Sequence, residues 1–109
     1  MSIELPTAIA AYIAGSNAHD AAACAACFTD DAVVRDEGRE RQGNAAIREW
    51  MEEVSKKYRP TVDVIDVGET DDETIVKGRV AGNFPGSPVE LRYAFTLAGE
   101  KIARLEIRP

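Results

Sequence analysis

Apolar residues recur every three to four positions in three segments of the first half of the chain, which is the spacing of a helix with one buried face. This spacing predicts one helix over residues 5–15 and another over residues 44–58. Between them, Asp20 is suited to cap a short helix that ends near Cys27. We therefore expect three helices before residue 60.

From Thr61 onward the period of the pattern changes to two, which is typical of strands with one buried face. The alternation predicts four strands, over residues 61–67, 74–84, 89–97 and 101–107. A shorter strand over residues 32–36 follows a turn at residues 29–31 and precedes a polar loop that ends at Gly43. This order predicts a single α+β domain over residues 1–109, with the helices on one face of a curved antiparallel meander.

Composition and charge narrow the class of protein. The chain has 109 residues, 45% of them apolar and 29% charged, as in an ordinary soluble globular protein. A domain of this length buries about 65% of its unfolded surface, so its core needs no disulfide or metal. The formal net charge of −6 argues against nucleic acid and anionic membrane surfaces as partners, because both attract basic faces. No apolar run is long enough to span a bilayer and no secretory signal is visible, so we expect a cytoplasmic protein.

The two cysteines, Cys24 and Cys27, form a C-A-A-C string with two interpretations. Such a pair at a helix N-terminus is typical of thiol redox sites, whereas two small buried residues in an Ala-rich helix need no chemistry. No Trp or Pro flanks the pair, which favours the structural interpretation. Together with the single histidine, His19, the cysteines are too few for a tetrahedral zinc site, and we assign His19 no catalytic role. We expect neither a metal nor a cofactor.

Three polar residues occupy positions where the pattern calls for an apolar side chain. Asp36 shares a strand face with Val34, and burial there would raise its pKa toward that of a general base. Because Glu and Gly follow it, the pattern alone favours Asp36 as a turn residue over a pocket carboxylate. Tyr12 lies on the apolar face of the first helix and Tyr93 in the middle of an apolar strand face. A buried phenol is either satisfied by the core or offered to a ligand, and both alternatives stay open.

Two glycines interrupt the apolar face of the strand over residues 74–84. At Gly78 and Gly82 the missing side chains indicate either a bend or room for a ligand. If they leave room, we expect a pocket beside the three polar residues, lined by Val34, Trp50, Val76, Gly78, Val80 and Phe95. Trp50 at its spacing is also typical of a core residue.

Several segments of the chain resemble a known superfamily. Residues 11–13, 17–20, 28–36 and 43–50 read AYI, NAHD, FTDDAVVRD and GNAAIREW. With the order of helices and strands, they resemble the nuclear transport factor two-like superfamily, and more closely its SnoaL-like and ketosteroid-isomerase-like branches. The resemblance implies a cone-shaped, curved antiparallel sheet wrapped around three N-terminal helices, a cystatin-like roll. Because this scaffold hosts several chemistries, the resemblance is more specific for fold than for activity.

Similarity to the ketosteroid isomerases implies roles for three residues. An oxyanion-stabilising tyrosine on the first helix falls on Tyr12, and a general-base aspartate after the first strand falls on Asp36. The second oxyanion donor falls on Tyr93, where the sequence departs from the acid of the family. A phenol still donates to an oxyanion, but it does not replace the acid that polyketide-cyclase relatives use at about this position.

Two functions follow from these residues. In the first, the domain binds a small apolar ligand and Asp36 removes a proton next to its carbonyl, with Tyr12 and Tyr93 as oxyanion donors. In the second, the domain is a homodimeric ligand-binding or association module without chemistry. The dimer is expected to use the outer face of the sheet, where a few apolar residues lie among cations. These apolar residues are Ile75, Ala81 and Ile102, and the cations are Lys77, Arg79, Arg92 and Arg104.

Overall fold

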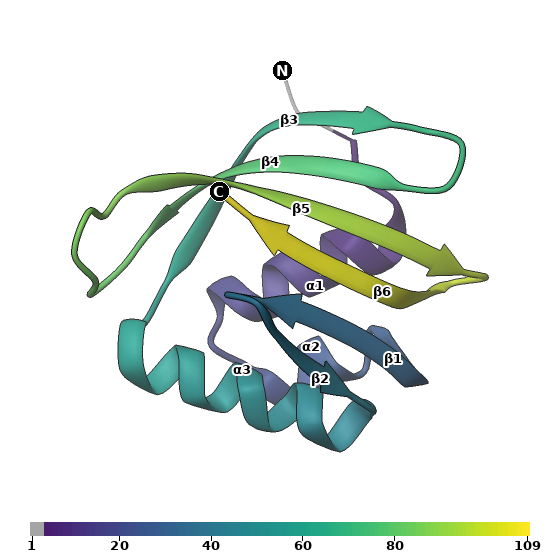
Figure 1. Ribbon diagram of the computed structural model, residues 1–109, viewed down its shortest axis with the longest axis horizontal. Coiled ribbons are helices and arrows are strands. Elements are labelled where there is room, and N and C mark those ends of the chain that lie inside the picture. Colours follow the sequence, from purple (N-terminus) through teal and green to yellow (C-terminus); the bar gives the residue numbers. More distant parts are fainter. Residues whose placement is uncertain (1–3) are drawn as a thin grey trace.

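The computed structural model describes residues 4–109, so the first three residues of the predicted domain lie outside it. The described residues form three helices and six strands (Figure 1). In chain order these are α1 Thr7–Asn17, α2 Ala21–Ala25, β1 Phe28–Asp36, β2 Arg39–Gln42, α3 Asn44–Tyr58, β3 Thr61–Glu69, β4 Thr74–Ala81, β5 Val89–Ala98 and β6 Lys101–Arg108.

The six strands form one sheet in the order β2-β1-β6-β5-β4-β3. Neighbouring strands run antiparallel, except that β1 and β6 are parallel. The expected α+β class, with a curved sheet around three N-terminal helices, is confirmed. The sequence pattern does not predict the parallel pair, which arises because the chain passes through α3 between β1 and the meander β3–β6.

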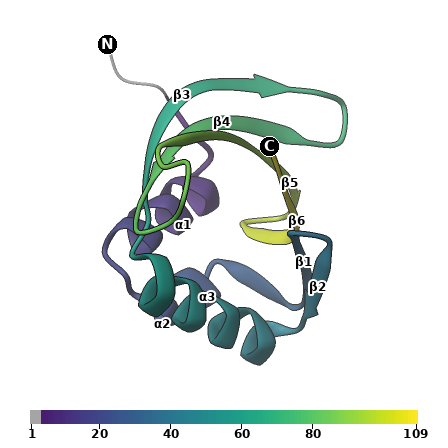
Figure 2. The ribbon, with the colours of Figure 1, turned by 60° about the vertical axis from the view of Figure 1, so that its left-hand side comes forward.

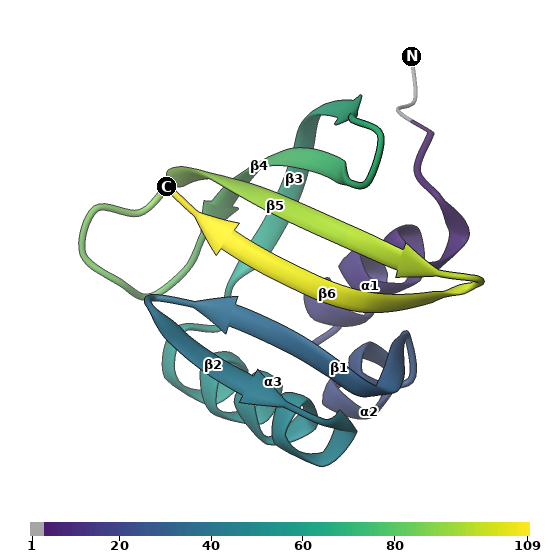
Figure 3. The same cartoon turned by 45° about the vertical axis from the view of Figure 1, so that its right-hand side comes forward.

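The sheet is strongly curved, and the helices lie on its concave side. In Figure 2 the strands form an arc, and α1 and α3 close its open side. Figure 3 shows β5, β6, β1 and β2 side by side in front of the helices. Two bulges contribute to the curvature, because Ile65 in β3 and Ala103 in β6 are extra residues without a partner on the neighbouring strand.

Specific side-chain bonds hold the helices in place. The Asp20 carboxylate accepts a hydrogen bond from the backbone N–H of Ala23 at 3.0 Å, which confirms it as the cap of α2. At the end of α1, the Asn17 amide donates to the carbonyl oxygen of Val62 (3.0 Å) and accepts from its N–H (2.7 Å). Asn17 thus takes the place of a neighbouring strand at the start of β3. None of the helices within residues 4–109 has the length and hydropathy to cross a membrane.

The core lies between the helices and the concave face of the sheet. Aromatic rings join the two layers, because Tyr12 packs edge-on against Phe28 (5.6 Å between centroids) and Phe95 (5.7 Å). Burial of each large apolar side chain contributes roughly 1.5–3 kcal/mol. The largest fully buried side chains include Ile9, Val34, Ile47, Val76, Phe95, Ile102 and Leu105.

The segment before α3 differs from the prediction in two places. β1 begins at Phe28 rather than at residue 32, and the expected turn at residues 29–31 is an irregular stretch of this strand. The expected loop between β1 and α3 contains β2, whose four residues RERQ are all polar. An edge strand of this kind has no apolar alternation to reveal it, and its charges discourage pairing with other chains.

One of the three apolar residues predicted for the convex face of the sheet, Ile102, does not belong to it. The bulge at Ala103 shifts the alternation of β6, so that Ile102 and Leu105 are both fully buried in the core. Ile75 stays half-buried and Ala81 exposed on their strand. Of the apolar residues predicted for a dimer interface, Ile75 and Ala81 therefore stay on the convex face and Ile102 does not.

Gly78 and Gly82 allow close contacts instead of leaving open space. A Cβ atom on Gly78 would lie 2.8 Å from Cγ1 of Val62 and 3.3 Å from Cε1 of Tyr93. A Cβ atom on Gly82 would lie 2.6 Å from the carbonyl oxygen of Tyr58, the last residue of α3. The alternative in which these glycines leave room for a ligand is therefore wrong. Gly78 instead lets the Tyr93 ring approach the backbone of β4.

We expect Gly78→Ala to lower the free energy of unfolding by about 1–3 kcal/mol, because the new methyl group meets the stiff, buried Val62 side chain. Gly68→Ala is the matched control, since nothing lies within 4 Å of its Cβ position. That control should be neutral or stabilise the protein by up to about 1 kcal/mol. Urea unfolding measures both variants, and equal stability of the two would contradict the role given to Gly78.

Candidate active site

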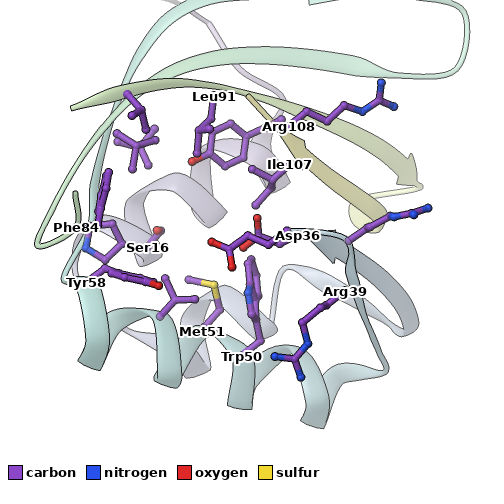
Figure 4. A pocket seen from close by; sticks show the side chains of 18 of the residues that line it. Ser16, Asp36, Arg39, Trp50, Met51, Tyr58, Phe84, Leu91, Ile107 and Arg108 are labelled. Atoms are coloured by element: carbon purple, nitrogen blue, oxygen red, sulfur yellow. The ribbon is translucent and has the colours of Figure 1, made fainter. Parts of the chain in front are cut away.

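A cavity of about 1050 Å³ opens between α3, the concave face of the sheet and the β1–β2 hairpin (Figure 4). This is large enough for a small-molecule ligand. Its wall is mainly apolar and aromatic, and charged side chains lie around it. The apolar and aromatic lining residues include Tyr12, Trp50, Met51, Val54, Tyr58, Val62, Val80, Phe84, Leu91, Tyr93 and Ile107.

Five of the nine residues predicted for the site line this cavity, namely Tyr12, Asp36, Trp50, Val80 and Tyr93. The other four are corrected by the structure. Val34, Val76 and Phe95 are fully buried in the core, and Gly78 is covered by Val62 and Tyr93. On β5 the border between core and cavity runs between Phe95 and Tyr93, two residues apart on the same strand face.

Asp36 is the last residue of β1, and Figure 4 shows its carboxylate pointing into the cavity above Trp50. The turn that follows uses Glu37 (φ 54°) and Gly38 (φ 75°), which suits a tight hairpin. Burial raises the pKa of the Asp36 carboxyl, and the neighbouring Glu37 charge raises it further. A hydrogen bond from the Trp50 side chain and the charge of Arg41 act in the opposite direction. The net upward shift of the pKa is the one a general base needs.

Two phenols lie in the wall of the same cavity. Tyr12 is 3% exposed and Tyr93 is 5% exposed. Within residues 4–109, the only hydrogen bond of the Tyr12 hydroxyl goes to the thioether sulfur of Met51, a weak acceptor, at 3.9 Å. Burial raises the pKa of both hydroxyls, and the Asp36 carboxylate adds to the rise in each. Both phenols therefore stay protonated at neutral pH and are able to donate a hydrogen bond.

Several residues that line the cavity were not predicted from the sequence, although the apolar pattern showed that some of them face the interior. The apolar stripe of α3 contains Met51, Val54 and Tyr58, and its C-terminal part faces the cavity instead of the core. Leu91 shares a strand face with Tyr93. Phe84 lies in the β4–β5 connection, where its ring packs edge-on against Tyr58 (5.9 Å between centroids) in the cavity wall.

Charged side chains surround the apolar interior. Arg39 and Arg41 lie on the inward side of β2, because their partners on β1 are Asp36 and Val34. Without β2, the sequence offered no way to place these two arginines beside the cavity. Lys57 extends over the ring of Tyr58, 5.1 Å from its centroid.

The thiols of Cys24 and Cys27 are buried and donate to the carbonyl oxygens of Tyr12 (3.7 Å) and Ala23 (3.3 Å). Burial raises the pKa of the Cys24 thiol to about 12 and also raises that of Cys27. Redox thiols need a lowered pKa, so the geometry favours the structural interpretation of this pair.

His19 does not line the cavity. Its Nδ1 atom lies 2.9 Å from the Ser55 hydroxyl, which ties the α1–α2 turn to α3. Among residues 4–109, no three His, Cys, Asp or Glu side chains gather closely enough to hold a metal ion.

The SnoaL-like domain family matches residues 9–105. The chain belongs to this family. This confirms the resemblance to the nuclear transport factor two-like superfamily and its ketosteroid-isomerase-like fold.

Solved structures with the same fold include a candidate polyketide cyclase from Sinorhizobium meliloti, with 38% identity, 95% of each chain covered and a TM-score of 0.91. A cystatin-fold protein from Novosphingobium aromaticivorans is 18% identical, with a TM-score of 0.79. The match covers 99% of this chain and 100% of that protein's chain. A protein from Catenulispora acidiphila with a ketosteroid-isomerase-like fold, in complex with trimethylamine, is 17% identical, with a TM-score of 0.85. The match covers 97% of this chain and 87% of that protein's chain. No curated protein matches the chain.

We expect Asp36→Asn to stabilise the SnoaL-like domain at pH 7.5 and to stabilise it less at pH 4. In the unfolded chain this carboxyl titrates near pKa 3.9, as is usual for Asp, and in the folded state it titrates at higher pH. The folded state thus holds a proton that the unfolded state has lost, and stability falls as the pH rises through this window. Asp36→Asn carries no charge at this position, so its folded state does not lose stability in this way as the pH rises.

Urea unfolding at the two pH values measures the difference. Asp63→Asn, at an exposed position of β3, corrects for the general effect of removing one negative charge from an acidic protein. A loss of stability at pH 7.5 in Asp36→Asn relative to this control would contradict the unfavourable burial of the Asp36 charge.

Proposed function

We propose that this SnoaL-like domain binds a small apolar carbonyl compound and that Asp36 removes a proton from the carbon next to the carbonyl group. Tyr12 and Tyr93 then donate hydrogen bonds to the enolate oxygen. One observation carries the proposal: a partly buried carboxylate with a raised pKa shares an apolar cavity with two buried, protonated phenols.

The proposed step balances without any further reactant. The electrons of the broken C–H bond form the C=C bond of the enolate, the carbonyl π electrons move to oxygen, and the proton moves to the Asp36 carboxylate. The apolar wall strengthens the attraction between the phenol donors and the oxyanion, because little water screens it. Where the substrate carries a β,γ C=C bond, the enolate is a dienolate, and return of the proton from Asp36 to the γ carbon completes an isomerisation.

The relative from Sinorhizobium meliloti supports chemistry of this class. That protein is a candidate polyketide cyclase, and an aldol cyclisation begins with the same removal of a proton next to a carbonyl. Tyr93 supplies a hydrogen-bond donor to the enolate oxygen, which fits an isomerase-like reaction. It does not replace the ionisable acid that polyketide-cyclase relatives use at about this position. Isomerase-like and cyclase-like activities nevertheless share the first step that we assign to Asp36.

The alternative function is a homodimeric ligand-binding module without chemistry. In that case the same cavity holds a ligand, but Asp36 only orients it. The homodimer, the cytoplasmic location and the absence of a cofactor remain predictions from the sequence.

2-Tetralone is a suitable probe for proton removal, and 2-naphthol is a planar analogue of its enol. We expect the protein to accelerate exchange of the 2-tetralone α protons for deuterium, measured by NMR in D₂O. Asp36→Asn should reduce this acceleration by about 10²–10⁴-fold, since the general base is lost. It should still bind 2-naphthol, which raises the melting temperature of both proteins.

Asp63→Asn serves as the control and should exchange protons as the unchanged protein does, because Asp63 lies away from the cavity. Binding of 2-naphthol without any dependence of exchange on Asp36 would favour the ligand-binding module. No shift of the melting temperature with 2-naphthol would contradict a preformed enolate site altogether.

A further inference from the structure

Ser16 is a polar residue in the apolar wall of the cavity, and the reaction proposed above does not use it. The residue is 8% exposed and lines the cavity. It follows Tyr12 by four positions on α1, so the two side chains share the inner face of the helix. Figure 4 shows its hydroxyl oxygen pointing into the cavity.

The Ser16 hydroxyl has no protein partner within residues 4–109. A helical serine commonly donates to the carbonyl oxygen four residues earlier, here that of Tyr12. No such side-chain bond forms, and this carbonyl accepts from the Cys24 thiol at 3.7 Å. Local structure therefore does not use the hydroxyl.

The oxygen of Ser16 is nevertheless accessible from the cavity. Within residues 4–109, no side-chain oxygen or nitrogen is both fully enclosed and without a hydrogen-bond partner. An unpartnered hydroxyl on a residue buried to this degree must therefore keep its small exposed area on the cavity surface. Its donor and both of its acceptor positions are free for the molecule that fills the space.

The chemistry of the ligand follows from this free hydroxyl. A purely apolar ligand would exclude solvent from the Ser16 hydroxyl and leave it without a hydrogen-bond partner, which weakens binding. A ligand oxygen at the same point would restore the bond. Because a hydroxyl both donates and accepts, an alcohol, a phenol or a carbonyl group fits equally well.

We propose that Ser16 binds a second oxygen of the ligand, so that the natural substrate is an apolar carbonyl compound with a further hydroxyl or carbonyl group. This inference rests on the proposed function of the cavity. Ser16 is a specificity residue: it holds the far part of the substrate and takes no part in the proton transfer between substrate and Asp36.

A comparison of 2-naphthol with 2,6-, 2,7- and 1,6-dihydroxynaphthalene tests the assignment by isothermal titration calorimetry. The three isomers place the second hydroxyl in different directions from the first. At least one should bind the unchanged protein about threefold to tenfold more tightly than 2-naphthol, the gain of one neutral hydrogen bond. Ser16→Ala should reduce this preference to about one and leave the affinity for 2-naphthol within twofold.

Ser55→Ala is the matched serine control. Its hydroxyl is bonded to His19 and does not line the cavity. This variant should lower the melting temperature and keep the preference for the diol. Ser16→Ala should show the opposite pair of results, because its hydroxyl has no protein partner to lose.

The outcomes separate the two proposals. If no diol binds more tightly than 2-naphthol, or if the preference survives in Ser16→Ala, the role of Ser16 is overturned while the proposed function stands. If 2-naphthol itself does not bind, the proposed function of the cavity is contradicted and the assignment of Ser16 fails with it.

Discussion

The curvature of the sheet determines where apolar side chains of the two layers meet and where they leave space. The bulge at Ile65 and the close approach allowed by Gly78 bend the meander around the helices. Over one part of the concave face, Phe95 and its fully buried neighbours fill the interior and leave no access to solvent. Beyond Tyr93 the strands and the C-terminal half of α3 no longer close on each other, and the cavity occupies that region. Core and candidate site are therefore two ends of one apolar layer.

At the border between core and cavity, Asp36 gains reactivity as a base, and its buried charge lowers the stability of the fold. Its position at the end of β1, directly before a tight turn, brings a charge to the edge of an apolar space. Removal of water raises the energy of the charged form, which is what makes the carboxylate a stronger base. The Trp50 side chain and Arg41 moderate this effect without abolishing it. Tyr12 and Tyr93 are held by aromatic contacts to Phe95 and present donors to the same space, so the packing that stabilises the core also positions the site.

Much of the fold was predictable because apolar periodicity reports burial directly. The bounds of α3, the cap at Asp20 and the class of fold follow from local pattern alone. Features that depend on pairing between distant segments did not follow. The all-polar strand β2 and the parallel contact of β1 with β6 leave no mark in the alternation, and the bulge at Ala103 reverses the face on which Ile102 lies. For the same reason the sequence identified Asp36, Tyr12 and Tyr93 as unusual residues, but not which apolar neighbours belong to core or cavity.

The proposed reaction depends most directly on the pKa of one carboxyl group, that of Asp36. Titration of the Asp36 carboxyl carbon by ¹³C NMR, identified by its absence in Asp36→Asn, measures the pKa of this group in the free protein and with 2-naphthol bound. We expect a pKa above the ordinary value of about 3.9 and a further rise when the ligand displaces water from the cavity. A pKa at or below that ordinary value, unchanged by the ligand, would contradict the assignment of Asp36 as a desolvated base.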